Sequence, residues 1–231
     1  MKYSEKELQT LKEEVSEMWT LVLSQLEKAK QAFLQGDVAL AREVVRREKQ
    51  VDAFELKIDS DCENYIALFS PVAVDLRLVL SLIRISITLE RIGDFAESIA
   101  HHVIDNDCHD IDLSILDELQ LEKMFDIVIT MLSDSFVALE SENTKIAGRI
   151  LSKDNEIDQL YYRSLDILTN YLQQAPAHIR DGLKTFTLIR KLERIGDHCS
   201  NIVEEIVFYV DAKVLKHGGK KTVVPQTESD C

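Results

Sequence analysis

Glycine and proline are scarce in this chain, since its 231 residues contain seven glycines and three prolines. Both residue types favour turns over helix interiors, so their scarcity favours long helices. No GxxxxGK or GxGxxG string occurs, which argues against nucleotide binding through a glycine-rich phosphate loop. Hairpin dipeptides flanked by alternating β-branched residues are also missing, which argues against strands.

Cysteines are few, and their spacing indicates neither a metal site nor a redox pair. The four, at Cys62, Cys108, Cys199 and Cys231, form no CxxC motif. Residues 1–14 are charged and lack the apolar core of a secretory signal. We therefore expect free thiols in a reducing cytoplasm. Uninterrupted apolar runs are only a few residues long, so no segment is predicted to span a membrane.

Positive charge is also in short supply. The chain has 27 Lys and Arg against 41 Asp and Glu, for a formal net charge of −14. A protein that neutralises nucleic-acid phosphates needs a basic face, and none is visible here, so nucleic acid is not an expected partner. The acidity suits cations or basic partner surfaces.

The pentapeptide Glu-Arg-Ile-Gly-Asp occurs twice, at residues 90–94 and 193–197, which points to an internal duplication. Other features follow the same register. Asp37 and Asn143 are good N-cap residues, and each is followed by apolar positions at helical spacing.

Two prolines follow the same register as the pentapeptides. Pro71 and Pro176 are each predicted to open the helix that carries a pentapeptide, because proline is at home in a first helical turn.

This periodicity predicts an all-α protein made of two pseudosymmetric three-helix bundles. The six long helices are expected at about 4–35, 38–68, 72–105, 112–141, 144–173 and 177–210. The expected division is a first repeat over residues 1–108, a second over 109–211 and a flexible C-terminal tail over 212–231.

Acidic pairs recur on equivalent helices of the two halves. Residues at i and i+4 share one helix face, so each pentapeptide places its Glu and Asp together, and the preceding helix carries a similar pair. The eight candidate metal ligands are Glu48, Asp52, Glu90, Asp94, Asp154, Asp158, Glu193 and Asp197. Glu55, Glu97 and Asn201 continue these faces and are candidate secondary ligands.

Spacing alone is weak evidence, because roughly seven such pairs would arise by chance among 41 acids. The recurrence in both halves strengthens it, and a bound cation would relieve the repulsion between like charges. Arg91 and Arg194 are expected to point elsewhere on their helices. Oxygen ligands favour hard ions such as iron(III), manganese, magnesium or calcium. The alternative is a plain solvated acidic face.

Gly93 and Gly196 occupy the same place in the two pentapeptides. A glycine inside a helix costs about 1 kcal/mol relative to alanine. Its repetition suggests that either a close neighbouring helix or a bound cluster needs the space. His198 is expected to be a packing or surface residue, because it lies about 100° round the helix from Asp197.

Three strings resemble the PhoU family of phosphate-regulation proteins. They are Ser-Pro-Val-Ala-Val-Asp-Leu-Arg at 70–77, Leu-Glu-Arg-Ile-Gly-Asp at 89–94 with Ile-Ala at 99–100, and Leu-Glu-Arg-Ile-Gly-Asp-His-Cys-Ser-Asn-Ile-Val-Glu at 192–204. The resemblance covers about residues 4–211. It departs at Ser70 and Thr88, where glutamine and aspartate are common, and at Ser98, which replaces the asparagine kept at Asn201. The first-half site is therefore expected to differ in affinity or nuclearity.

The resemblance implies that the eight carboxylates form motif pairs holding multinuclear iron clusters, with zinc, manganese or magnesium as alternatives. It also implies a cytoplasmic, non-catalytic negative regulator of phosphate uptake and of the phosphate-starvation response. Such a protein would act as a homodimer and couple the phosphate ABC transporter ATPase to a sensor histidine kinase, reaching the membrane only through these partners.

Two other functions are compatible with a helical bundle rich in carboxylates. One is a di-iron carboxylate oxidase, but such sites use Glu-x-x-His motifs, and none of the six histidines has Glu three residues before it. The other is a structural bundle whose acids bind nothing.

Overall fold

The computed structural model describes residues 3–105 and 113–213, and this part of the chain is helical without any strand. The first repeat contains α1 (Tyr3–Gln35), α2 (Val38–Phe69) and α3 (Ala73–Ile104). The second contains α4 (Leu113–Glu118), α5 (Leu121–Glu140), α6 (Ala147–Gln174) and α7 (Ile179–Asp211), with 3-10 turns at Thr144–Ile146 and Pro176–His178. The predicted all-α fold of two three-helix bundles is confirmed.

The predicted helix starts are confirmed in part. The Asp37 carboxylate accepts a hydrogen bond from the Leu40 amide at 3.0 Å and caps α2. Asn143 also acts as a cap, but it begins a 3-10 turn rather than α6 itself. Pro176 lies in the first turn of the 3-10 segment that leads into α7. Pro71 lies before the first residue of α3, at the predicted break, so it precedes that helix and is not part of its first turn.

The expected single helix over 112–141 is also wrong, because the chain breaks between α4 and α5. Gln120 adopts a left-handed conformation with φ of 54°, which ends the regular helix. Leu119 and Leu121, on either side of it, are each only 2% exposed. Burial of both leucines offsets the local strain, and the break lets α4 pack against α6.

Some of the sequence expectations fall outside the described residues. Of the expected tail, only Ala212 and Lys213 are described, and Cys108 and Cys231 also lie outside. Cys62 and Cys199 are free and buried. Within 3–105 and 113–213, no helix is both long enough and apolar enough to cross a membrane.

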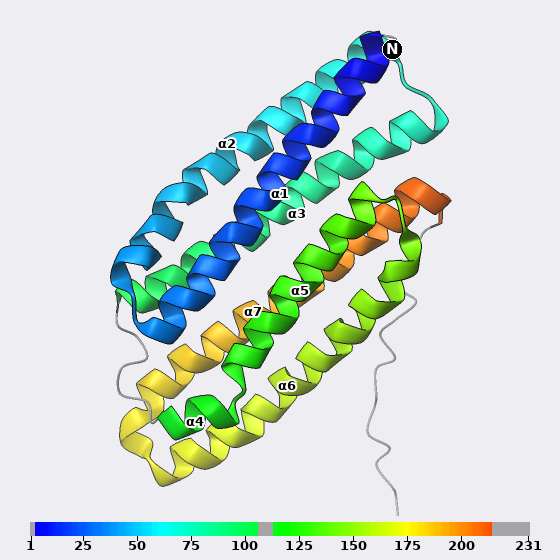
Figure 1. The fold of residues 1–231 in the computed structure, drawn as a ribbon. Coiled ribbons are helices and arrows are strands. Elements are labelled where there is room, and N and C mark those ends of the chain that lie inside the picture. Colours follow the sequence, from blue (N-terminus) through cyan, green and yellow to red (C-terminus); the bar gives the residue numbers. More distant parts are fainter. Residues whose placement is uncertain (1–2, 106–112, 214–231) are drawn as a thin grey trace, which may run out of the picture.

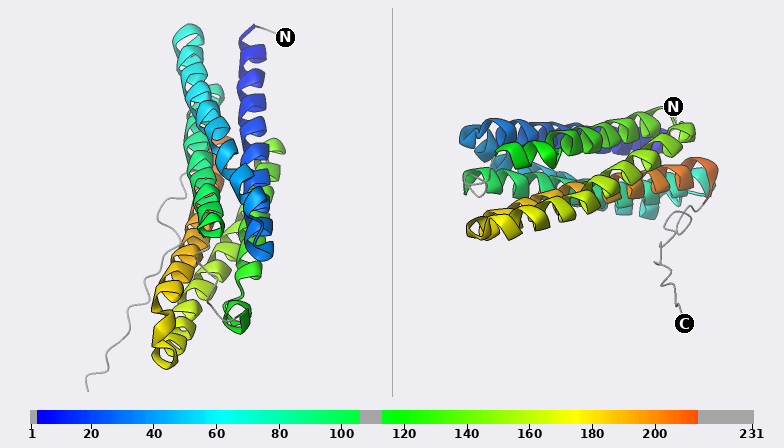
Figure 2. Two further views of the ribbon diagram at one scale, coloured as in Figure 1. Left: turned by 90° about the vertical axis from the view of Figure 1, so that its left-hand side faces the viewer. Right: turned by 90° about the horizontal axis from the view of Figure 1, so that it is seen from below.

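The two bundles lie side by side, with their long helices running along the molecule (Figures 1 and 2). Helices α1, α2 and α3 pack against one another, as do α5, α6 and α7. The repeats meet along two seams, one between α3 and α7 and one between α1 and α5. Trp19, fully buried on α1, donates a hydrogen bond from Nε1 to the Leu132 carbonyl at 3.2 Å and ties the second seam together.

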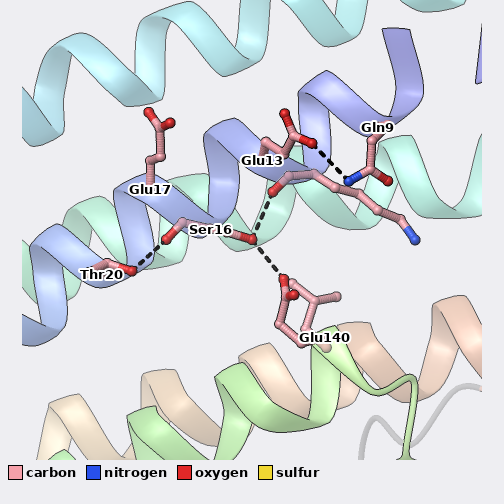
Figure 3. Close-up of a pocket in the computed structure, with 8 residues that line it drawn as sticks. Gln9, Glu13, Ser16, Glu17, Thr20 and Glu140 are labelled. Carbon is pink, nitrogen blue, oxygen red and sulfur yellow. Dashed lines mark hydrogen bonds between the residues drawn. The ribbon is translucent and has the colours of Figure 1, made fainter. Parts of the chain in front are cut away.

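Towards the C-terminal end of α5, the α1–α5 seam opens into a polar cleft of about 760 Å³ (Figure 3). Ser16 donates a hydrogen bond to Glu140 at 2.7 Å across this cleft. Farther along, Glu142 accepts hydrogen bonds from Lys12 at 3.1 Å and from the Tyr209 hydroxyl at 2.6 Å. The repeats are therefore joined by a few polar contacts on this side.

Candidate metal centre

In the first repeat, the candidate carboxylates of α2 and α3 converge on one region. Glu48 is the most enclosed of them, at 4% exposure. Burial raises the pKa of Glu48 to about 7, and the negative charges of Asp94, Asp52 and Glu97 add to that rise. A hydrogen bond from Gln25 opposes it. These acids are therefore close enough to repel one another.

Glu90 and Asp94 belong to the same acidic group. Burial raises the pKa of Glu90, and the charges of Asp94, Glu55 and Asp52 raise it further. Burial and the Asp52 charge likewise raise the pKa of Asp94. The structure thus places all four candidate ligands of this repeat together, with the two secondary candidates Glu55 and Glu97 beside them.

The Glu48 carboxylate is held on one side only. Its Oε2 accepts a hydrogen bond from Gln25 Nε2 at 2.8 Å, while its buried Oε1 has no hydrogen-bond partner. A Cβ atom added at Gly93 would lie 2.7 Å from that Oε1, so the missing side chain leaves room for this oxygen. A buried carboxylate oxygen with a vacant lone pair fits a metal ligand.

The second repeat has a different environment at the equivalent glycine. A Cβ atom at Gly196 would lie 3.0 Å from Cγ2 of Ile157 and 3.4 Å from Oδ1 of Asp154. Burial raises the pKa of the Cys199 thiol, and the charge of Asp154 contributes to that rise. Asp154 on α6 therefore faces α7, but an aliphatic side chain takes the place nearest the glycine.

Arginine also enters the second site, contrary to the sequence expectation. Arg194 Nη1 lies 3.5 Å from Asp197 Oδ2, one turn along α7, and this pair compensates part of the acidic charge. Asp158 and Glu193 are half-buried on α6 and α7, and Asn201 is exposed on α7.

No group of three or more His, Cys, Asp or Glu side chains within the described ranges is already positioned to hold a metal ion. An ion shared by the acids of α2 and α3 would therefore require their side chains to rotate inward. The donor set is carboxylate oxygen throughout, which suits hard ions.

The histidines near these acids play other parts. The His198 ring packs against the Phe95 ring in a tilted arrangement with 5.7 Å between centroids, which confirms its predicted packing role. Burial lowers the pKa of His198, and the charges of Arg91 and Arg194 lower it further. His101 Nε2 lies 4.0 Å from Glu97 Oε1.

Gln25 is the residue of this site that the sequence reasoning missed. It is fully buried on α1, where it donates to Glu48 and, at 3.4 Å, to the Val44 carbonyl. The only signal in the sequence is a glutamine between the apolar residues Val22 and Leu26 on the buried face of a helix.

Comparison with known proteins gives one consistent result. A family model described as the PhoU domain matches residues 15–103 and again residues 121–206. The chain is 32% identical over 219 residues to a protein of Aquifex aeolicus named phosphate-specific transport system accessory protein PhoU homolog, covering 92% of this chain and 95% of that protein. It is also 32% identical over 213 residues to the phosphate-specific transport system accessory protein PhoU of Escherichia coli, covering 92% and 87%.

Solved structures agree with these sequence matches. The crystal structure of PhoU from Pseudomonas aeruginosa superposes with a TM-score of 0.82 at 28% identity, over 90% of this chain and 99% of that one. The phosphate transport system regulatory protein PhoU of Streptococcus pneumoniae gives a TM-score of 0.81 at 27% identity, over 92% and 99%.

Proposed function

The chain belongs to the PhoU family, and from this membership we propose that it is a negative regulator of phosphate uptake and of the phosphate-starvation response. The observation that supports this most is the doubled family match, which covers both repeats and most of the chain. The names of the relatives, accessory and regulatory proteins of phosphate transport, favour a regulatory role over a catalytic one.

Deleting the gene tests this role. We expect derepressed phosphate uptake and raised expression of phosphate-starvation genes in phosphate-rich medium, both restored by the intact chain. Unchanged uptake and expression in the deletion strain would contradict the proposal.

We further propose that the protein works as a cytoplasmic homodimer that couples the phosphate ABC transporter ATPase to a sensor histidine kinase. The long helices of residues 3–105 and 113–213, together with the chain's formal net charge of −14, support an adaptor that meets partners through protein contacts. Light scattering of the purified protein and co-purification with each partner test these two parts separately. A monomer would contradict the proposed homodimer. Failure to retain either partner would contradict the proposed coupling of the transporter to the kinase.

The carboxylates are proposed to bind metal, with Glu48, Asp52, Glu90 and Asp94 as the stronger set and Asp154, Asp158, Glu193 and Asp197 as the weaker. The ranking is supported by the nearest neighbour of each glycine, which is Glu48 Oε1 at Gly93 and Ile157 at Gly196, and by the Arg194 charge beside Asp197. A multinuclear iron cluster, or zinc, manganese or magnesium, would supply positive charge that relieves the repulsion among these acids.

Elemental analysis of Asp94→Asn and Asp197→Asn tests the metal proposal. We expect Asp94→Asn to lose more metal per chain than Asp197→Asn, with both variants folded by circular dichroism. Absence of metal from native and reconstituted protein alike would end the metal proposal and leave the regulatory one intact.

A further inference from the structure

A second candidate site lies on the α3–α7 seam, and it includes Asn201, which was named above as a candidate secondary metal ligand. The two helices lie alongside each other where the repeats meet (Figure 1), and a groove of about 310 Å³ opens between them. Its polar lining includes Arg84 and Arg91 from α3, and His198, Asn201, Glu204 and Glu205 from α7. Arginines from one repeat thus face polar side chains of the other.

One end of this groove is already charge-compensated. Arg84 Nη1 lies 3.0 Å from Glu205 Oε2, and the Arg84 guanidinium also lies over the Phe208 ring, 5.9 Å from its centroid. The Glu205 side chain is only 10% exposed. A partly buried ion pair backed by an aromatic ring gives this end a fixed shape.

The remaining charged groups of the groove, Arg91 and Glu204, form no ion pair with any described residue. Arg91 on α3 and Glu204 on α7 both line it, yet neither has an ion-pair partner among residues 3–105 and 113–213, and they do not pair with each other. The Asn201 amide lies exposed in the same lining. A cation, an amide donor and a carboxylate acceptor therefore face one open space.

We propose that this groove binds inorganic phosphate as its hydrogenphosphate dianion. The Arg91 guanidinium and the Asn201 amide donate hydrogen bonds to phosphate oxygens, and the Glu204 carboxylate accepts the phosphate O–H. The ligand would bridge the Arg91 and Glu204 side chains, which line the same groove and form no ion pair with each other.

The carboxylate makes the proposed site selective. Sulfate has no O–H at neutral pH, so Glu204 would repel it without gaining a hydrogen bond. A phosphate monoester has its second pKa at about 6, so at pH 8 its phosphate group is a dianion that has no O–H of its own. Of these three anions, only inorganic phosphate combines the double charge with an O–H donor on the anionic group itself.

The other end of the seam does not repeat this arrangement. In the register of the two pentapeptides, the residue equivalent to Glu204 is His101, so the acceptor is missing there. The residue equivalent to Arg91 is Arg194, which is already ion-paired with Asp197. The expected stoichiometry is therefore one phosphate per chain. This proposal rests on the groove itself and does not depend on the regulatory role.

Isothermal titration calorimetry of the full-length, chelator-treated protein at pH 8 tests the proposal, because chelation removes metal that could itself hold phosphate. We expect inorganic phosphate to bind at one site per chain and to bind at least about tenfold more tightly than sulfate or glycerol 3-phosphate. No binding at millimolar phosphate, or equal binding of sulfate, would overturn it.

Single substitutions then locate the site. We expect Arg91→Gln to weaken phosphate binding at least about tenfold, because it removes a charge-assisted hydrogen bond. Glu204→Gln should weaken phosphate binding and strengthen sulfate binding. The ratio of the two affinities should therefore fall towards one. Arg42→Gln, which alters an exposed arginine on α2, is the matched control and should leave both affinities unchanged.

The carboxylate variant Asp94→Asn separates this site from the metal centre. It should retain phosphate binding. If Asp94→Asn loses binding while Arg91→Gln keeps it, residual metal holds the phosphate and the groove proposal is wrong. All four changed side chains are exposed or half-buried, so circular dichroism should show the wild-type helical content.

Discussion

The two Glu-Arg-Ile-Gly-Asp segments are identical in sequence, but the structure surrounds them differently. Beside Gly93 lies a buried carboxylate of α2, with one oxygen bonded to Gln25 and the other without a partner. Beside Gly196 lies the methyl group of Ile157, and an arginine compensates Asp197. One copy of the glycine makes room for an acid, and the other chiefly for helix packing.

This difference shows that the helix opposite a motif decides what the motif does. The pentapeptide supplies two acids and a gap in each repeat. In the first, α2 brings an uncompensated carboxylate into that gap, and in the second, α6 brings an aliphatic side chain. The first repeat therefore has more negative charge to relieve, and three experiments can sharpen or break this contrast.

The largest effect is expected from Glu48→Gln in the chelator-treated protein. Folding raises the pKa of Glu48 from 4.5 to about 7. The contribution of protonated Glu48 to the stability of the folded state is therefore fully present below pH 4.5, and it is lost as the pH rises through about 7. The neutral glutamine avoids that loss. We expect the variant to be more stable than the wild type by about 3 kcal/mol at pH 8, and the difference to vanish below about pH 4.5.

Urea unfolding across pH 4 to 8 measures this difference. Asp52→Asn, which changes an exposed carboxylate on the same helix, is the control and should give a much smaller effect. A pH-independent difference between the wild type and Glu48→Gln would show that burial of charge at Glu48 does not weaken the fold.

Alanine at the two glycines should have different consequences. At Gly93 the new Cβ displaces a carboxylate oxygen, so we expect metal affinity of the first repeat to fall at least about tenfold, while stability changes by no more than about 1 kcal/mol. At Gly196 it presses on buried Ile157, so we expect a loss of about 1–2 kcal/mol in stability and little change in metal content.

Thermal unfolding measures the change in stability of both alanine variants, and metal titration measures their change in metal affinity. If the two variants lose metal and stability in the same proportion, the proposed division of roles between the glycines is wrong.

The smallest effect is expected from Arg194→Gln, which releases Asp197 from its ion pair. An exposed pair of this kind contributes about 0.2–1 kcal/mol, so we expect metal affinity of the second repeat to rise by a factor of about 1.4 to 5. Metal titration in an Asp94→Asn background reports the second repeat alone, and Arg190→Gln on the same helix is the control. Weaker binding after Arg194→Gln would mean that the arginine supports the site.

Periodicity was enough to predict the helices, because long apolar stripes and the Asp37 cap are local signals. The break at Gln120 was not predictable, since glutamine has no particular preference for a left-handed conformation and only the burial of its neighbours explains it. The candidate ligands were found from spacing within helices. The partners that distinguish the two sites, Gln25 and Ile157, come from other helices and are visible only once the chain is packed.

The contact between the Phe95 and His198 rings has a consequence for symmetry. These residues occupy equivalent positions in the two repeats, so the α3–α7 seam is built like the interface of a two-fold homodimer. In a true homodimer, every substitution would appear on both sides of the axis. Here both halves belong to one chain, so each side can change alone, and a single polypeptide can present two unequal ends of one seam to the molecules around it.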